Sequence, residues 1–248
     1  MWDALEDKQI QFLRGQLALV CAAPGRGKSA FVLSYVVQAN VTCLYISADS
    51  DAFTQITRMA SILTGWPMSK SKEAVLTEDM GESVDLLEQT PIRFVYDASP
   101  TLDTIEDNLQ AYLQTYGTYP SVLVVDNITN IVLDGSEEAQ AGLEGLMDYL
   151  HALARNTGAC VIGLHHVKGD YNDGNKPIPL GGIKEQIGRV PELILTLYRI
   201  PNEFGPDTLF VCAVKARAGV SDSTGVDAAE LEFDGATMSI RDFPRPLG

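Results

Sequence analysis

A glycine-rich turn stands near the start of the chain, between an apolar run and a stretch with helical patterning. Residues 22–29 read AAPGRGKS and match the phosphate-binding pattern G-x-x-x-x-G-K-[ST], with Ala22 in place of the first glycine. Gly25 and Gly27 allow the loop to curl with its backbone N–H groups pointing inward. The helix N-terminus that follows adds partial positive charge, so the turn is suited to hold phosphate.

The last two residues of this turn carry its side-chain chemistry. Lys28 is long enough to reach terminal phosphates, and the hydroxyl of Ser29 is a ligand for Mg²⁺. The alternative is a chance glycine-rich turn, but the strand-like run before it and the helical pattern after it are the context that the motif requires. The nucleotide-binding residues predicted here are Ala23, Pro24, Gly25, Arg26, Gly27, Lys28, Ser29 and Ala30.

A second metal anchor is predicted at the end of another apolar run. Residues 121–127 read SVLVVDN, so Asp126 stands at the carboxyl end of a predicted strand. Ligands bind at that end of the strands in open α/β sheets. An aspartate that caps a turn is the alternative, but the phosphate loop elsewhere in the chain favours a Mg²⁺ site shared by Asp126 and Ser29.

Two more aspartates follow the second strand-like run, in residues 44–51 (LYISADSD). Hydrolysis needs a group that orients or deprotonates water, and a carboxylate at this edge would face the terminal phosphate. Asp51 is placed as the N-cap of a helix, so we assign Asp49 to catalysis and Asp51 to the cap. The apolar pattern of that helix is Phe53, Ile56, Met59 and Leu63.

Two adjacent histidines end residues 160–166 (CVIGLHH). Side chains alternate between the two faces of a strand, so one histidine faces the packed interior and the other faces the nucleotide edge. We predict that His165 is the packed one and that His166 senses the terminal phosphate. His151 lies on the polar side of a predicted helix and is assigned no role.

Composition limits the possible functions. The 248 residues carry a net charge of −15, which argues against a protein that coats nucleic acid over its surface but not against a small basic patch. Residues 1–8 are polar and acidic, and no run is long enough to cross a membrane, which predicts a cytoplasmic protein without a membrane partner. Reduced core thiols are predicted for Cys21, Cys43, Cys160 and Cys212.

Short apolar runs alternate with helical patterns along the chain. Amphipathic stripes predict helices over 103–116 and 142–155, and the polar residues 65–90 suit a helical insertion. The alternation implies an α/β fold, with a mostly parallel central sheet flanked by helices and antiparallel strands at the far edge. The predicted strands are 16–23, 41–48, 93–97, 121–127, 160–166, 193–200, 208–217 and 230–234.

The order of these motifs is similar to the ATPase core of RecA-like hexameric replicative DNA helicases of the DnaB type. In that family an alanine at the first loop position and a proline before the glycine are usual. The resemblance covers about residues 14–243 and implies a RecA-like P-loop NTPase that binds ATP with Mg²⁺. It divides the chain into an N-terminal extension, 1–13, and an ATPase (helicase) domain, 14–248.

Individual segments carry the same resemblance. In residues 45–61 (YISADSDAFTQITRMAS), Asp49 falls on the family's catalytic glutamate and Arg58 on the arginine of the following helix. The paired histidines are closer to the RepA-type plasmid helicases. In residues 211–219 (VCAVKARAG), Lys215 and Arg217 match the strand that reaches into the neighbouring subunit's site. The alternative for these two residues is a solvated edge strand; on one face, they suit a clamp on phosphate.

Two loops would line the channel of such a ring. Residues 129–140 are acidic and poorly suited to DNA, whereas residues 167–184 are rich in glycine and proline. A mobile solvated loop is an equal alternative for the second segment. If the ring forms, its copies would contact successive phosphates of single-stranded DNA through Lys168, Lys176 and Lys184.

The resemblance therefore implies an ATP-dependent DNA helicase core that forms a homo-oligomer, as a hexameric ring, and acts in replication. A primase or a helicase loader is the partner class that this implies, in a bacterial, phage or plasmid context. Two alternatives stay open. One is a RecA-type ATPase for recombination or protein remodelling, and the other is a weakly hydrolysing nucleotide-binding assembly module, which Asp49 in place of glutamate would favour.

Overall fold

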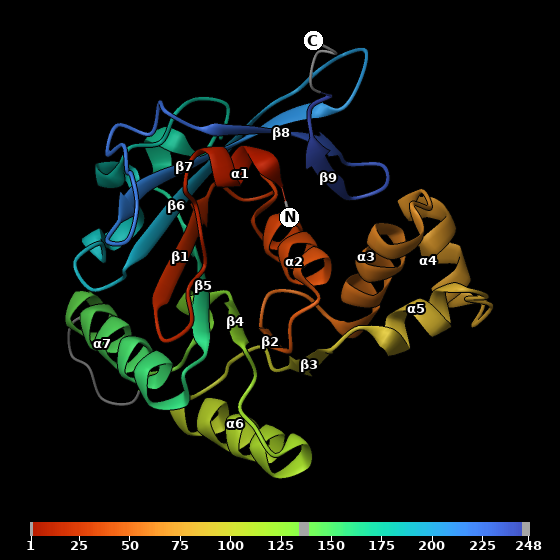
Figure 1. Cartoon of the computed structure of the whole chain (residues 1–248), viewed down its shortest axis with the longest axis horizontal. Coiled ribbons are helices and arrows are strands. Elements are labelled where there is room, and N and C mark those ends of the chain that lie inside the picture. Colours follow the sequence, from red (N-terminus) through yellow and green to blue (C-terminus); the bar gives the residue numbers. More distant parts are fainter. Residues whose placement is uncertain (1, 134–138, 245–248) are drawn as a thin grey trace.

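The computed structural model of the chain describes residues 2–133 and 139–244. Within them one nine-stranded sheet runs in the order β3-β2-β4-β5-β1-β6-β7-β8-β9 (Figure 1). The strands are β1 (Leu17–Ala22), β2 (Cys43–Ser47), β3 (Ile92–Tyr96), β4 (Val122–Asp126), β5 (Cys160–His166), β6 (Leu193–Ile200), β7 (Asp207–Ala216), β8 (Ala229–Asp234) and β9 (Ser239–Asp242).

The sheet is mixed, with parallel pairing on one side and antiparallel pairing on the other. The six strands from β3 to β6 are parallel, and the three that follow are antiparallel. The central strands are continuously apolar because helices cover both of their faces. This is the α/β fold with an antiparallel edge that the sequence predicted, although β9 was not among the predicted strands.

Helices pack on both faces of the sheet and make two hydrophobic cores (Figure 1). One core holds Phe31 and Met59 from two helices, together with the N-terminal helix. The other holds Leu109 and Leu150 from the two helices whose stripes the sequence predicted. The helices of the first face are α1 (Asp3–Asp7), α2 (Lys28–Ala39) and α3 (Ala52–Thr64), and those of the second are α6 (Leu102–Tyr116) and α7 (Ala139–Thr157).

The predicted insertion is helical. It forms α4 (Met68–Leu76) and α5 (Ser83–Gln89), which project beyond α3 at one side of the molecule (Figure 1). A buried hydrogen bond of 2.8 Å from the Ser61 hydroxyl to that of Ser71 joins α3 to α4. Short 3-10 turns complete the chain: η1 (Ile128–Asn130), η2 (Gly169–Tyr171), η3 (Leu180–Gly182) and η4 (Lys184–Gln186).

The N-terminal extension packs against the far edge of the sheet. The Trp2 indole is buried, stacks on Phe31 at 5.3 Å between ring centroids and donates a 2.9 Å hydrogen bond to the carbonyl of Ile240. Leu5 and Ile10 are buried in the same core. The extension thus shares its core with the strands at the other end of the chain.

Two predictions about composition can be compared with this fold. The four cysteines are free and buried, as expected of core thiols, and burial raises the pKa of each one. No helix in the described ranges is long and apolar enough to cross a membrane. All of the acidic residues of loop 129–140 belong to 134–138, which lie outside the described residues.

Candidate nucleotide site

The glycine-rich turn joins the end of β1 to the start of α2. Gly25 has φ +68° and Gly27 has φ +102°, the left-handed region that glycine enters without steric cost. Lys28 opens the helix, and its ammonium donates to the carbonyl of Ala22 at 3.4 Å. Burial lowers the pKa of Lys28, and the negative charge of Asp126 opposes that shift. The turn therefore holds a buried cation beneath a loop of backbone N–H groups.

The two predicted metal ligands meet at this edge of the sheet. Asp126 ends β4 and is 1% exposed. Its carboxylate accepts a 2.8 Å hydrogen bond from the Tyr45 hydroxyl in β2. Burial raises the pKa of the Asp126 carboxyl, while hydrogen bonds from Ser29 and Tyr45 lower it. Tyr45 was not predicted as a site residue, because only the pairing of β2 with β4 brings it beside Asp126.

These residues fit a magnesium ion. A hydroxyl and a carboxylate oxygen are hard donors, and Mg²⁺ is usually held by one or two such protein ligands plus phosphate oxygens and water. Asp126 is buried next to the Ser29 hydroxyl, so a cation would offset the desolvation of its charge. Ser29 and Asp126 are therefore the residues that would hold the metal.

The strand pairing also fixes the position of Asp49. The backbone N–H groups of Ala48 and Asp49 both donate to the carbonyl of Asp126, at 2.7 and 3.1 Å. The turn after β2 is thereby tied to the end of β4, at the edge that carries the phosphate loop. Asp51 caps α3 as predicted, with its carboxylate accepting from the Thr54 N–H at 2.8 Å.

The two histidines divide as the alternation of the strand predicts. His165 is fully buried, and its Nε2 donates to the carbonyl of Lys184 at 3.0 Å. His166 is only partly buried, and its Nε2 accepts from the Asn127 amide at 2.7 Å. The proton of the neutral His166 ring is then on Nδ1, which is buried and has no hydrogen-bond partner among the described residues. Burial and then the positive charge of Lys28 lower the pKa of His166, which favours its neutral form.

A depression of about 450 Å³ lies between the phosphate loop, Asp49 and His166, within the size range of about 300–1,000 Å³ typical of small-molecule sites. Its walls include elements that the sequence reasoning did not assign to the site: the end of β6, β8 and the turn before β9. The predicted residues that line it are Pro24, Gly25, Gly27, Lys28, Ser29, Ala30, Asp49, Arg58 and His166; the unpredicted ones are Ser50, Arg199, Phe233, Gly235 and Met238.

Arg199, one of the unpredicted residues, contacts the phosphate loop, an aspartate and an aromatic ring. Its guanidinium donates to the carbonyl of Gly25 at 3.3 Å, pairs with Asp207 at 3.3 Å and lies 5.0 Å from the centroid of the Phe233 ring. A planar cation beside an aromatic ring in a phosphate-binding depression is suited to the planar base of a nucleotide. A Tyr-Arg pair at the end of an apolar strand was the only signal for it in the sequence.

The profile of the AAA domain family matches residues 10–170. The chain belongs to the AAA domain family. This P-loop ATPase domain is 56% identical over 246 residues to the gene 65 protein of Mycobacterium phage L5. The match covers 98% of this chain and 92% of that protein. It is 57% identical over 230 residues to the gene 65 protein of Mycobacterium phage D29, covering 92% and 99%.

Solved structures show the same fold at low sequence identity. One solved ATPase domain superposes with a TM-score of 0.82 at 15% identity, covering 98% of this chain and 90% of that one. A DnaB-like replicative helicase, solved for its interactions with primase, also gives 0.82 at 15% identity; the match covers 98% of this chain and 61% of that one. The RadB recombinase gives 0.63 at 17% identity, covering 97% of each. This AAA domain thus has the RecA-like P-loop NTPase fold.

Lys215 and Arg217 lie near the opposite ends of the central strands from the phosphate loop. Ala216 pairs with Leu193 at the start of β6, whereas Ala22 pairs with Leu197 near its end. These levels are separated by roughly 13 Å of strand, so neither cation reaches the phosphate loop of its own chain. Lys215 donates to the carbonyls of Gly188 and Arg189 at 2.6 and 2.7 Å.

The predicted DNA-binding segment of this AAA domain is folded onto the body. The Lys168 N–H donates to the carbonyl of Gly182 at 2.8 Å, and its ammonium donates to that of Gly181 at 2.7 Å. Lys176 lies over the Tyr171 ring, with 5.1 Å from its ammonium to the centroid. Lys184 pairs with Glu185 at 3.5 Å. Lys168 and Lys184 line one hollow with His166, so the segment adjoins the nucleotide site.

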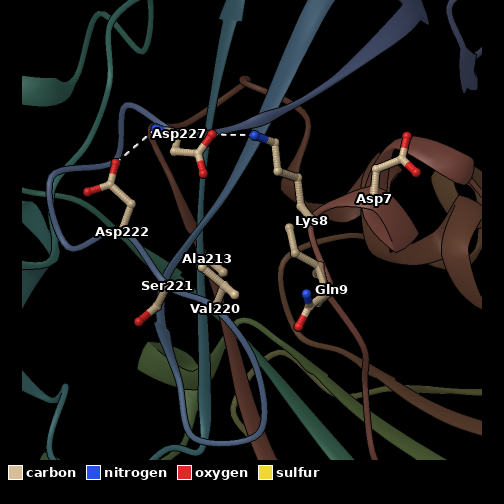
Figure 2. Close-up of a pocket in the computed structure, with 9 residues that line it drawn as sticks. Asp7, Lys8, Gln9, Ala213, Val220, Ser221, Asp222 and Asp227 are labelled. Atoms are coloured by element: carbon tan, nitrogen blue, oxygen red, sulfur yellow. Dashed lines mark hydrogen bonds and ion pairs between the residues drawn. The ribbon is translucent and has the colours of Figure 1, made fainter.

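A second hollow lies between the N-terminal extension and the loop after β7 (Figure 2). Figure 2 shows Lys8 paired with Asp227 and the Asp222 carboxylate accepting from the Asp227 N–H. Asp222 also accepts from the N–H groups of Thr224 and Val226 at 2.9 Å each, and these hydrogen bonds lower the pKa of its carboxyl. These charged groups hold the loop in place, and we assign them no chemistry.

Proposed function

We propose that this chain is an ATP-dependent DNA helicase core that hydrolyses ATP at subunit interfaces and translocates on single-stranded DNA during replication. The observation that carries the proposal is that Arg217 and the phosphate loop lie at opposite ends of the central strands. An exposed arginine at that end can act on a phosphate only in the site of another copy. Six-fold closure of such a head-to-tail contact would give a ring.

Each residue then has a defined part in hydrolysis. The loop N–H groups and Lys28 hold the phosphates, and Asp49 orients the attacking water and accepts its proton. His166 lines the depression and senses the terminal phosphate. Arg217 of the adjacent copy stabilises the charge that develops on the transferred phosphoryl group. Magnesium, when bound, neutralises phosphate charge and orients the phosphate oxygens.

The DNA contact is proposed for residues 167–184. The chain has a net charge of −15, so DNA has to be held by a local basic surface. Lys168, Lys176 and Lys184 are presented by one folded segment, and two of them share a hollow with His166. Arg199 links this segment to the phosphate loop, because its N–H donates to the carbonyl of Gly174 and its guanidinium to that of Gly25.

The first test is steady-state ATP hydrolysis with and without single-stranded DNA, with the mass measured by light scattering. Wild type, Lys28→Ala and Arg217→Ala are compared. Arg241→Ala is the matched control, because Arg241 also pairs with a glutamate, at 2.9 Å, but on the β8–β9 hairpin. We expect a ring that DNA stimulates, with turnover reduced at least 100-fold in Lys28→Ala and Arg217→Ala and retained in Arg241→Ala.

Other results would favour the remaining functions. Turnover that ignores DNA, in an assembly that still depends on Arg217, favours a RecA-type ATPase for recombination or protein remodelling; the likeness in fold to the RadB recombinase is compatible with it. ATP binding without turnover favours a nucleotide-binding assembly module. A monomer in which Arg217→Ala has no effect would contradict the shared site. Primase or a helicase loader becomes the partner to test only if DNA stimulates turnover.

A further inference from the structure

Glu192 carries a buried carboxylate and lies next to Arg217, at the end of the strands that is far from the phosphate loop. It directly precedes β6 and is 3% exposed. Its backbone N–H donates to the carbonyl of Leu17 at 2.9 Å, and its carbonyl accepts from the Arg217 N–H at 2.9 Å. One carboxylate oxygen, Oε2, accepts from the Leu17 N–H at 3.0 Å. The residue therefore joins β1, β6 and the end of β7 at one point.

The other carboxylate oxygen faces three basic side chains. Oε1 of Glu192 lies 2.8 Å from Nε2 of His151, 3.5 Å from Nη1 of Arg217 and 3.8 Å from Nη2 of Arg155. A carboxylate taken out of water is stable only when it is paired and hydrogen-bonded. Because several basic groups share this one carboxylate, Arg217 is attracted to Glu192 without being the sole partner that neutralises it.

The Arg217 guanidinium is paired within its own chain but remains partly exposed to solvent. Its Nη1 faces Glu192, its Nη2 donates to the carbonyl of Arg189 at 3.4 Å, and its side chain is still 51% exposed. A guanidinium has five N–H donors, so the remaining ones are available for phosphate. The Lys215 ammonium donates to the carbonyls of Gly188 and Arg189, so Lys215 and Arg217 both hydrogen-bond to the turn before Glu192.

We infer that Glu192 is a positioning residue that holds Arg217 ready to enter the nucleotide site of a neighbouring copy. The inference rests on the proposed function, since Arg217 has a task only if that site is shared. The sequence offered no signal for it, because a glutamate in a turn before a strand is ordinarily solvated. Preorganisation lowers the entropy cost of bringing a flexible arginine to the transition state.

The experiment measures kcat and KM for ATP in Glu192→Gln, with Glu232→Gln as the matched control. Glu232 pairs with Arg241 at 2.9 Å on the β8–β9 hairpin. We expect kcat of Glu192→Gln to fall about 10- to 100-fold, the scale set by misplacing a catalytic group by about 1 Å. The KM should change less than about threefold, and Glu232→Gln should behave as wild type.

Mixed oligomers distinguish a positioning role of Glu192 from a general loss of folded structure in the Glu192→Gln variant. Lys28→Ala subunits lack a working phosphate loop but keep Arg217, whereas Glu192→Gln subunits keep the loop but misplace Arg217. Mixing the two creates sites with both halves intact, so turnover should rise well above that of either variant alone. The Arg217→Ala, Glu192→Gln double variant should have the kcat of Arg217→Ala, because Glu192 acts only through that arginine.

The failure of this inference is distinguishable from the failure of the proposed function. If Lys28→Ala complements Arg217→Ala but not Glu192→Gln, or if Glu192→Gln has the wild-type kcat, the inference is overturned and the shared site stands. If Arg217→Ala itself is not complemented, the shared site fails and the inference falls with it. Glu192→Asp, which keeps the charge, replaces Glu192→Gln if that variant does not assemble, and it should be complemented in the same way.

Discussion

Asp49 and Asp51 are identical side chains, two positions apart, that lie in different surroundings. The Asp51 carboxylate accepts a hydrogen bond from the Thr54 N–H at the start of α3, and hydrogen bonds from the side chain and then the N–H of Thr54 lower the pKa of the exposed carboxyl. Asp49 instead lines the depression with Lys28 and His166. Aspartate is one methylene shorter than the glutamate of the helicase family, so the distance to the attacking water is the sensitive quantity here.

At this scale we predict that Asp49→Asn lowers kcat at least 100-fold, because the amide cannot accept the proton of the attacking water. The affinity for ATP should stay within about threefold, since binding depends on the loop N–H groups and Lys28. Asp51→Asn is the control, because asparagine caps a helix as well as aspartate does. Steady-state kinetics and a nucleotide-binding titration measure both effects, and equal turnover of the two variants would contradict the assignment.

Among the elements, two loops from different ends of the sheet lock together next to the site. Gly225 has φ +78°, and a Cβ there would lie 2.3 Å from the carbonyl oxygen of Ile178. The Leu180 N–H donates to the carbonyl of Ser223 at 2.9 Å, and the Thr196 hydroxyl donates to that of Ile178 at 2.8 Å. The lysine-bearing segment is therefore fastened both to β6 and to the loop after β7.

We predict that Gly225→Ala destabilises the protein by about 3 kcal/mol. Left-handed backbone costs an alanine about 1–2 kcal/mol, and the clash with the Ile178 backbone adds about 1–3 kcal/mol. Gly117→Ala is the control: Gly117 has φ +74° at the end of α6 but no atom within 4 Å of the added Cβ, so only the backbone cost applies. Urea unfolding measures both, and equal free energies of unfolding would show that the loops do not meet as described.

The whole molecule combines a strongly acidic chain with basic groups at two places. One is the lysine-bearing segment beside the nucleotide site, and the other is the edge that carries Arg155 and Arg217 around Glu192. Under the proposed function, the first place would contact single-stranded DNA, and the second would contact the phosphates of a nucleotide held by a neighbouring copy. An acidic outer surface would limit DNA contact to such local patches.

We predict that replacing Lys168, Lys176 and Lys184 with alanine removes the stimulation of ATP turnover by single-stranded DNA. The slope of log K against log salt for DNA binding should become shallower by about 2, since single strands contribute about 0.7 for each phosphate contact. A Lys70→Ala, Lys72→Ala variant on α4 is the control and should keep both properties. Binding titrations at several salt concentrations and turnover assays measure the outcome; an unchanged slope would place the DNA contact elsewhere.

Much of this molecule follows from local chemistry. The phosphate loop, the Asp51 cap, the core strands and the burial of His165 rather than His166 depend on dihedral preferences and on the period of the apolar residues, which act over a few neighbouring positions. These are the features that the sequence by itself determined. The predicted helical insertion belongs with them, although its two helices could not be separated without seeing how they pack on α3.

The tertiary structure decided everything that depends on which strands are neighbours. Only the pairing of β2 with β4 brings Tyr45 to Asp126, and only the packing of the hairpin and β6 brings Phe233 and Arg199 to the phosphate loop. The basic groups around Glu192 come from α7 and from the end of β7. Contacts between residues far apart in sequence depend on sheet order and register, which local periodicity does not specify.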